Sequence, residues 1–139
     1  MTLQQGIYRC AVSVAGPADL KTFFNWEGSR NGFNTDATRF WRAVIGADAG
    51  GDGVMSVLSP TSAAARADAP IMLIHGKDDT VVPIEQSELM ESALKRAGKP
   101  YEMVVLNGED HWLSREDTRK VMLRAAVEFV EKHNPAKVN

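Results

Sequence analysis

The chain has 139 residues, of which 44% are hydrophobic and 24% are charged, a composition typical of one soluble globular domain long enough to bury a core. Its formal net charge of −2 gives no broad attraction for nucleic acid, and no run approaches the roughly 18 apolar residues of a membrane-spanning helix. We therefore expect neither nucleic acid nor a membrane among its partners.

The single cysteine and the first residues say little about the compartment. Because Cys10 is the single cysteine, the chain can form neither an intrachain disulfide nor a cluster of cysteine metal ligands. We therefore expect Cys10 to pack as a small apolar side chain in a strand. Residues 1–5 lack the basic and apolar regions of a signal peptide. If the chain is the tail of a longer protein, any targeting segment would lie upstream, so the cytoplasm and the periplasm both remain open.

The front half of the chain predicts one strand, one helix and a long irregular segment. Residues 8–16 are small and β-branched and end at Gly16 and Pro17, which predicts a strand closed by a turn. Residues 18–58 alternate aromatic clusters with polar and glycine-rich pieces. They favour an irregular excursion over a sheet, with one helix from about Asp36 to Ile45.

The central part predicts a short helix, a buried strand and a longer helix. Ser59 and Pro60 are typical of a capped helix start. The unbroken apolar run 71–74 indicates a parallel strand that is covered on both faces. A helix is then expected from Pro83 to Ala97, stopped by Gly98. Its predicted buried face consists of Leu89, Met90, Ala93, Leu94 and Ala97.

The last part predicts one more strand and a final helix. Residues 101–106 form an apolar run that ends in a polar loop containing His111. The spacing of Ser114 and Asp117 predicts a capping box at the start of the final helix. We expect that helix to bury Met122, Ala125, Ala126, Phe129 and Val130.

An acid and a base follow the two apolar strands, at Asp79 and His111. Taken singly, a loop aspartate is more often a turn residue and a loop histidine is usually just solvated. Parallel neighbouring strands would nevertheless bring both to one sheet edge, where open α/β sheets place catalytic groups. Their order, Asp then His, is the one that α/β-hydrolases use after their serine. His75 ends a strand before glycine, and we interpret it as structural, with its ring bonded to local backbone.

Two segments carry a resemblance to a known family: His75-Gly76-Lys77-Asp78-Asp79-Thr80-Val81-Val82-Pro83 and Gly108-Glu109-Asp110-His111-Trp112. They resemble the C-terminal end of the peptidase domain in the prolyl oligopeptidase family, serine peptidases that include dipeptidyl and acylaminoacyl peptidases. The resemblance covers most of the chain. It implies the C-terminal part of an α/β-hydrolase fold, with about three parallel strands and with crossover and flanking helices.

The resemblance also implies roles for particular residues. Asp79 maps to the catalytic acid and His111 to the base, with Asp78 as the alternative acid. In the family, the segment after the strand that corresponds to residues 8–16 here contributes aromatic side chains to the pocket for the residue before the scissile bond. Phe23, Phe24 and Trp26 lie in this segment and are otherwise core or covering side chains. No metal or organic cofactor is implied.

The nucleophile is missing from these residues. α/β-Hydrolases present their serine in a G-x-S-x-G turn, but no serine here has glycine at both −2 and +2. We therefore expect residues 1–139 to form a single partial α/β-hydrolase domain that begins near the family's sixth sheet strand. The nucleophile-bearing front half would be absent, and the chain would be inactive alone.

The expected function is that of a C-terminal segment of a serine peptidase, which supplies the acid and the base for peptide hydrolysis. Peptides would be substrates of the full-length enzyme. A non-catalytic oligomeric assembly module, or a fragment of an esterase or dienelactone-hydrolase relative, is the alternative. The strand from Tyr8 to Ala15 would have an open edge, so we expect a homo-oligomer formed through it.

Overall fold

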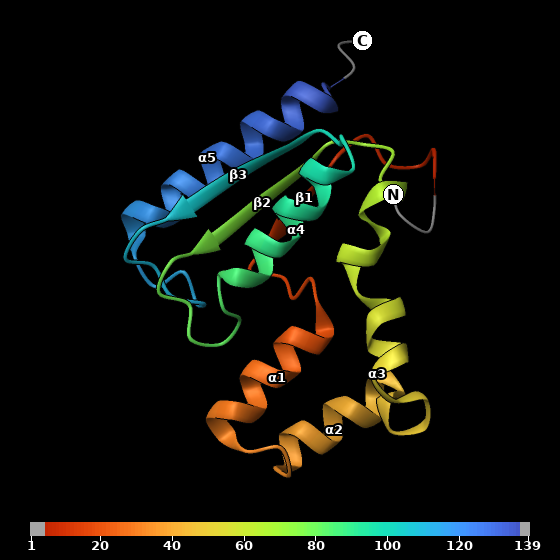
Figure 1. Cartoon of the computed structure of the whole chain (residues 1–139). Coiled ribbons are helices and arrows are strands. Elements are labelled where there is room, and N and C mark those ends of the chain that lie inside the picture. The colour runs from red at the N-terminus through yellow and green to blue at the C-terminus, as the bar shows by residue number, and fades with distance from the viewer. Residues whose placement is uncertain (1–4, 137–139) are drawn as a thin grey trace.

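Three parallel strands form one sheet in the order β1-β2-β3 (Figure 1). The structure is a computed structural model that describes residues 5–136, apart from the side chains of residues 48–50 and 52. The strands are β1 (Ala11–Val14), β2 (Ile71–Gly76) and β3 (Tyr101–Leu106). The predicted parallel sheet is confirmed, although the first strand is shorter than the expected run over residues 8–15.

The central strand β2 is buried along its whole length, as its apolar sequence predicts. Successive side chains point to opposite faces, so Ile71 and Leu73 pack in one cluster with Met90 and Leu94 of helix α4 (Glu85–Arg96). Met72 and Ile74 pack on the other side with Phe129 of helix α5 (Glu116–His133). Figure 1 shows these two helices on opposite faces of the sheet.

Helix α4 matches its predicted end but not all of its predicted face. Gly98 stops the helix in a left-handed conformation with φ of 64°, and the Lys99 N–H donates to the Leu94 carbonyl at 3.0 Å. Leu89 is 37% exposed, so its predicted burial is wrong. The polar side chains of Gln86 and Ser87 are buried instead because each has a hydrogen-bond partner.

Helix α5 begins at Glu116 rather than at Ser114, and no side chain caps its first turn. The predicted capping box is wrong, because the Ser114 hydroxyl donates to the Asp110 carboxylate in the preceding loop. Phe129 is 2% exposed as predicted, whereas Val130 is 39% exposed, so its predicted burial is wrong. Among the described residues, no helix has both the length and the apolarity to cross a membrane.

Residues 18–58 are mostly helical, which corrects the predicted irregular excursion. They contain α1 (Leu20–Asn31), α2 (Asp36–Ile45) and α3 (Ala47–Leu58), and only the middle helix was expected. The glycine-rich stretch does not end α3; it bends it at Gly51, whose φ of 60° lies outside the helical region. In Figure 1 these helices form a layer beside the sheet. A small cluster of Phe24, Ala47 and Met55 holds them together.

Ser59 links two helices of this layer. Its hydroxyl accepts the Leu20 N–H at 2.9 Å and donates to the Met55 carbonyl at 2.7 Å, so it links the end of α3 to the start of α1. It does not cap the following 3₁₀ helix η1 (Pro60–Arg66), contrary to prediction. Cys10 is half-buried just before β1, where it packs against the cluster on the α5 side.

Candidate active site

Asp79 and His111 are in direct contact at the carboxyl ends of β2 and β3. The Asp79 Oδ2 atom lies 2.8 Å from His111 Nδ1. The Asp79 side chain is completely buried, while that of His111 is 25% exposed. Parallel pairing of Gly76 with Leu106 sets the two following loops side by side. The sheet therefore joins an acid and a base that are distant in sequence.

The surroundings of the pair fix the imidazole tautomer. Asp79 Oδ1 accepts the backbone N–H groups of Val81 and Val82, both at 2.8 Å. Because an ionised carboxylate only accepts hydrogen bonds, His111 Nδ1 must carry the proton that it shares with Oδ2. The lone pair of Nε2 is then available, and within residues 5–136 no hydrogen bond is formed to it. Such a ring can remove a proton from a nucleophile.

Asp78, the alternative acid, has a different place. Asp78 is exposed, and its backbone N–H donates to the Glu109 carbonyl at 3.0 Å. This bond ties the acid-bearing loop to the histidine-bearing loop. The structure brings Asp79, and not Asp78, to His111.

Glycine at position 76 allows these loops to approach each other. A Cβ atom there would lie 2.5 Å from the Glu109 carbonyl oxygen and 2.8 Å from that of Asp110. Both obstacles are backbone atoms, so no side-chain rotation could relieve the clash. The glycine after His75 is therefore required for the geometry of the pair.

Glu109 anchors the histidine loop from inside. Its fully buried carboxylate accepts hydrogen bonds from the Thr118 hydroxyl, the Asp110 N–H at 3.0 Å and the Arg115 N–H at 3.4 Å. Desolvation by itself would raise the pKa of Glu109, but the hydrogen bonds from Thr118 and from the backbone outweigh it, so the pKa lies below its ordinary value. This role of Glu109 was not predicted from the sequence, because its partner Thr118 lies on the following helix.

Asp110 shapes the turn that presents His111. Its Oδ1 atom accepts the backbone N–H groups of Trp112 at 2.9 Å and Ser114 at 3.2 Å, and Oδ2 accepts the Ser114 hydroxyl at 2.7 Å. The Ser114 hydroxyl is the main cause that lowers the pKa of Asp110. The ring of Trp112 is 74% exposed and meets the His111 ring edge to face at 5.2 Å between centroids.

His75 is buried and takes its partners from the loop and helix that follow β2. Its Nε2 atom lies 2.9 Å from the Val82 carbonyl oxygen, and its Nδ1 atom lies 2.7 Å from the Ser87 hydroxyl. The predicted bond between this ring and local backbone is confirmed.

An apolar pocket of about 400 Å³ lies between the helical layer and the acid-bearing loop. Phe23 and Phe24 line it, but Trp26 does not; the Trp26 ring stacks on Phe23 and lies under the Arg30 guanidinium at 4.6 Å. The other apolar side chains of the wall, which were not expected there, include Leu20, Trp41, Ile45, Val81 and Val82.

Part of this pocket could have been found from the sequence. Ala37, Trp41 and Ile45 recur at four-residue spacing on α2, so they share one helix face, and all three line the pocket. Val81 and Val82 gave no such signal, because loop residues have no periodicity. Among the described residues, no group of three or more histidine, cysteine or carboxylate side chains is placed to hold a metal ion.

A parallel sheet that carries an acid after one strand and a bonded imidazole after the next is the arrangement of the α/β-hydrolases. The family model of the prolyl oligopeptidase family matches residues 1–136. The chain belongs to this family of serine peptidases, which confirms the resemblance seen in the two motifs.

Individual relatives are similar over most of this chain but are much longer. The uncharacterized peptidase YuxL of Bacillus subtilis (strain 168) is 30% identical over 105 residues, which are 75% of this chain and 14% of that protein. A puromycin-hydrolyzing peptidase of Mycobacterium tuberculosis is 27% identical with a TM-score of 0.82, covering 96% of this chain and 20% of that one. An acylaminoacyl peptidase of Pyrococcus horikoshii shares the fold at 21% identity and a TM-score of 0.80, over 100% and 22% of the two chains. This chain spans about a fifth of these structures.

Proposed function

We propose that the chain supplies the acid and the base of a serine peptidase, with Asp79 and His111 in these roles. The observation that carries the proposal is the 2.8 Å contact between Asp79 Oδ2 and His111 Nδ1, with Nε2 left as an acceptor. No serine of the sequence stands in a G-x-S-x-G turn, so the nucleophile would come from outside these 139 residues. Residues 1–139 would then be one part of a larger hydrolase domain.

The expected reaction is hydrolysis of a peptide bond in two stages. His111 Nε2 takes the proton of the serine hydroxyl as its oxygen attacks the carbonyl carbon, and then gives this proton to the leaving amine. Asp79 keeps Nδ1 protonated and stabilises the imidazolium ion that forms between these transfers. Water then releases the acyl group by the same steps.

The pocket beside the acid-bearing loop supports a preference for peptides. We propose that it takes the side chain that precedes the scissile bond, because Val81 and Val82 both line it and bind Asp79 through their N–H groups. Its wall is mainly apolar and its volume is about 400 Å³, which suits a large apolar or aromatic side chain. The relatives described as puromycin-hydrolyzing and acylaminoacyl peptidases favour amide bonds over the esters of the alternative function.

The roles of the pair can be tested in an enzyme that contains a nucleophile. Residues 1–136 would replace the matching segment of YuxL, and turnover of a chromogenic peptide would be measured. Replacing Asp79 or His111 by alanine should lower kcat by about 10⁴ or more, as in the serine protease triad. Asp78→Ala is the matched control and should have little effect. A damaging Asp78→Ala with a mild Asp79→Ala would show that the acid is wrongly assigned.

The chain by itself should be inactive. A histidine without its serine activates only water, so we expect no peptide hydrolysis and no reaction with a fluorophosphonate probe. Intact-mass spectrometry after incubation with the probe is the measurement. Stoichiometric labelling of any of its serines would contradict this proposal.

The open edge of β1 supports a second proposal, association of two copies of the chain. Among the described residues, β1 pairs only with β2, and the N–H groups of Ala11 and Ala15 point to that side, where they donate to the carbonyls of Pro70 and Ile74. The alternation of a strand therefore places the Val14 N–H on the open side. We propose a two-fold dimer in which the strands from Tyr8 to Ala15 meet.

Light scattering coupled to size exclusion, over a dilution series, tests the dimer. Val14→Pro removes the outward N–H without removing a bond to β2, so it should produce monomers. Val14→Thr keeps that N–H and should remain dimeric. A folded wild-type monomer at micromolar concentration would exclude association through this edge.

A further inference from the structure

His75 stands out among the buried polar groups because the acid–base chemistry does not use it directly, yet it touches the acid. Its side chain has no exposed surface, and its Nε2 atom lies 3.4 Å from Asp79 Oδ2, the same oxygen that binds His111. Oδ2 therefore lies between two imidazole rings. The alternation of side chains along β2 turns His75 toward α4, the face on which Ile71 and Leu73 also pack.

The partners of His75 determine which nitrogen carries its proton. A carbonyl oxygen can only accept, so the contact of 2.9 Å with Val82 O requires a proton on Nε2. In the neutral ring, Nδ1 then accepts the hydroxyl proton of Ser87 across 2.7 Å. Ser87 thus holds the ring in the tautomer that directs an N–H group toward Val82 and Asp79.

This ring also controls the turn that aims the acid. Val82 binds His75 through its carbonyl group and Asp79 Oδ1 through its N–H group. Movement of Val82 would therefore remove one of the two N–H groups that bind Asp79 Oδ1, while loss of the ring would remove the group beside Oδ2. Val82 also lines the apolar pocket, so the same contact places part of the pocket wall.

We propose that His75 is a positioning residue for the Asp79–His111 pair, kept in its Nε2–H tautomer by Ser87. Ser87, His75, Asp79 and His111 form a continuous chain of polar contacts from α4 to the site. This inference rests on the function proposed above, but its test needs no turnover. Buried networks of this kind hold their members in one arrangement when every group is satisfied.

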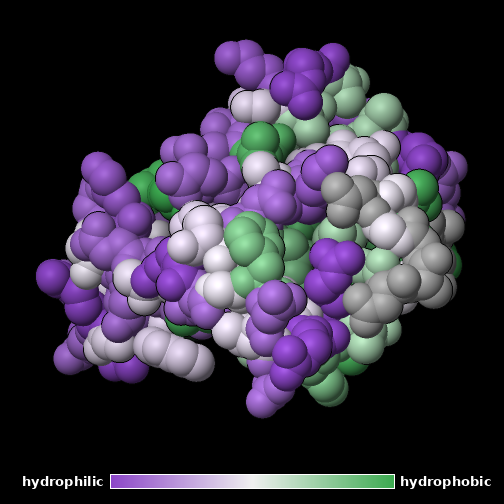
Figure 2. Space-filling model, turned by 60° about the horizontal axis from the view of Figure 1, so that its bottom comes forward, coloured by the Kyte–Doolittle hydropathy of each residue, from purple (hydrophilic) through white to green (hydrophobic). Residues whose placement is uncertain are grey.

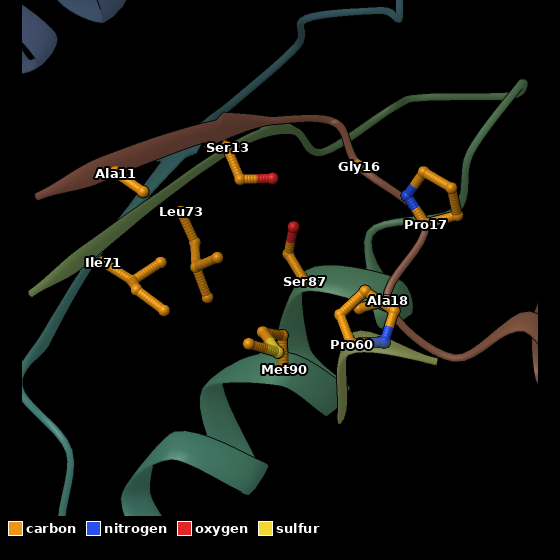
Figure 3. A pocket seen from close by; sticks show the side chains of 10 residues that line it. All are labelled: Ala11, Ser13, Gly16, Pro17, Ala18, Pro60, Ile71, Leu73, Ser87 and Met90. Carbon is orange, nitrogen blue, oxygen red and sulfur yellow. The ribbon is translucent and has the colours of Figure 1, made fainter. Parts of the chain in front are cut away.

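Ser87 is buried and forms the α4 end of this network. It lines an apolar cavity of about 200 Å³ between β1 and α4. Figure 3 shows the Ser13 and Ser87 hydroxyls extending into this space, with Met90 below them. Ser87→Ala therefore only enlarges an existing cavity, and alanine favours the helix. This variant can weaken the network while the protein stays folded.

The readout is the proton on His111 Nδ1, observed by NMR in the whole chain and assigned from its loss in His111→Gln. In the wild type we expect a low-field signal that exchanges slowly with water. His75→Phe keeps a ring but removes both nitrogens, so exchange should become faster by roughly threefold to tenfold, the range expected for one lost hydrogen bond. His75→Gln places an amide N–H near the former Nε2 and should restore slow exchange in part.

Ser87→Ala should change exchange in the same direction by a smaller factor. Ser92→Ala is the matched control, because Ser92 is exposed on the same helix, and it should leave the signal unchanged.

If His75 had a purely structural role, its substitution would lower the melting temperature without altering the exchange of the His111 proton. Folded His75→Phe and Ser87→Ala proteins that both keep the wild-type signal would overturn the proposal, and if His75→Phe does not fold, Ser87→Ala alone decides. The two proposals can fail separately. If substitutions of His75 change the His111 signal but Asp79 and His111 prove dispensable for turnover, the proposed function is refuted and the positioning role of His75 is retained.

Discussion

The loops that carry Asp79 and His111 and the helical layer of α1 to α3 are held in place by different kinds of contact. Buried polar side chains bonded to nearby backbone hold the loops, as Asp79 and Glu109 do. A small apolar cluster holds the helical layer, and Arg30 ties it to the acid-bearing loop by donating to the Thr80 carbonyl at 3.0 Å. The reacting groups are therefore fixed locally, while the wall of the apolar pocket depends on contacts between separate elements.

The surface reflects the same contrast. Phe40, Trp41 and Val44 of α2 are all more than half exposed, whereas the whole of β2 is buried. Figure 2 looks toward the helical layer and shows hydrophobic groups between hydrophilic ones on this face. Substitutions in the layer should consequently cost less stability than substitutions around β2.

The largest difference in stability between the sheet and the helical layer is expected for large-to-small substitutions. Ile74 is 0% exposed at the centre of the sheet, so Ile74→Ala should lower the free energy of unfolding by about 2–5 kcal/mol. Phe40 is 60% exposed, and Phe40→Ala should change it by no more than about 0.5 kcal/mol. Urea unfolding followed by circular dichroism measures both. Equal losses would show that the helical layer is as tightly packed as the core.

Two glycines provide a sharper comparison. In Gly76→Ala the new Cβ would meet backbone atoms of Glu109 and Asp110, so we expect a loss of about 1–3 kcal/mol. In Gly28→Ala the obstacle is the ring of Phe33, a side chain on a residue that is 60% exposed, so we expect it to move aside. Because alanine favours a helix interior by about 1 kcal/mol, Gly28→Ala should be neutral or stabilising. Thermal unfolding that ranks the two variants in the opposite order would contradict this account.

Acid should release the histidine loop through Glu109. The pKa of this carboxyl is lowered in the folded chain, so its contribution to stability is fully present above the unfolded value of 4.5. That contribution is lost as the pH falls below 4.5 and through the lower folded pKa. Glu109→Gln should therefore flatten the dependence of unfolding free energy on pH below 4.5. A wild-type slope in this variant would exclude Glu109 as the source.

A modest effect is expected at the link between the two regions. Arg30→Ala removes the exposed bond to Thr80, worth about 0.5–1.5 kcal/mol, and also the contact of the guanidinium with the Trp26 ring within α1. Hydrogen exchange of the α1 amides should become faster by a few-fold, while that of β2 stays unchanged. Arg39→Ala is the control, because Arg39 bonds Asn34 and Asp36 in its own segment. Unchanged α1 exchange in Arg30→Ala would show that the layer is held by other contacts.

The comparison explains which sequence predictions succeeded. The strands at residues 71–76 and 101–106, the crossover helix and its stop at Gly98 follow from local signals, and all are present. α1 was missed because its apolar residues, including Phe23 and Phe24, follow no clear face and its cap at Asp19 has few neighbouring cues. The serine cap predicted at Ser59 and the capping box predicted at Ser114 failed because other backbone groups or loop carboxylates compete for a serine hydroxyl.

The sequence by itself determined the order of strand, acid, helix, strand and base, and hence the sheet edge at which Asp79 and His111 meet. It also determined that a serine in the required turn is absent from these residues. Only the tertiary structure decided that Asp79 rather than Asp78 turns inward, because that choice depends on the N–H groups of Val81 and Val82. It alone revealed the contact of His75 with the acid, since a sequence encodes neighbours along the chain while burial and hydrogen bonding join groups across it.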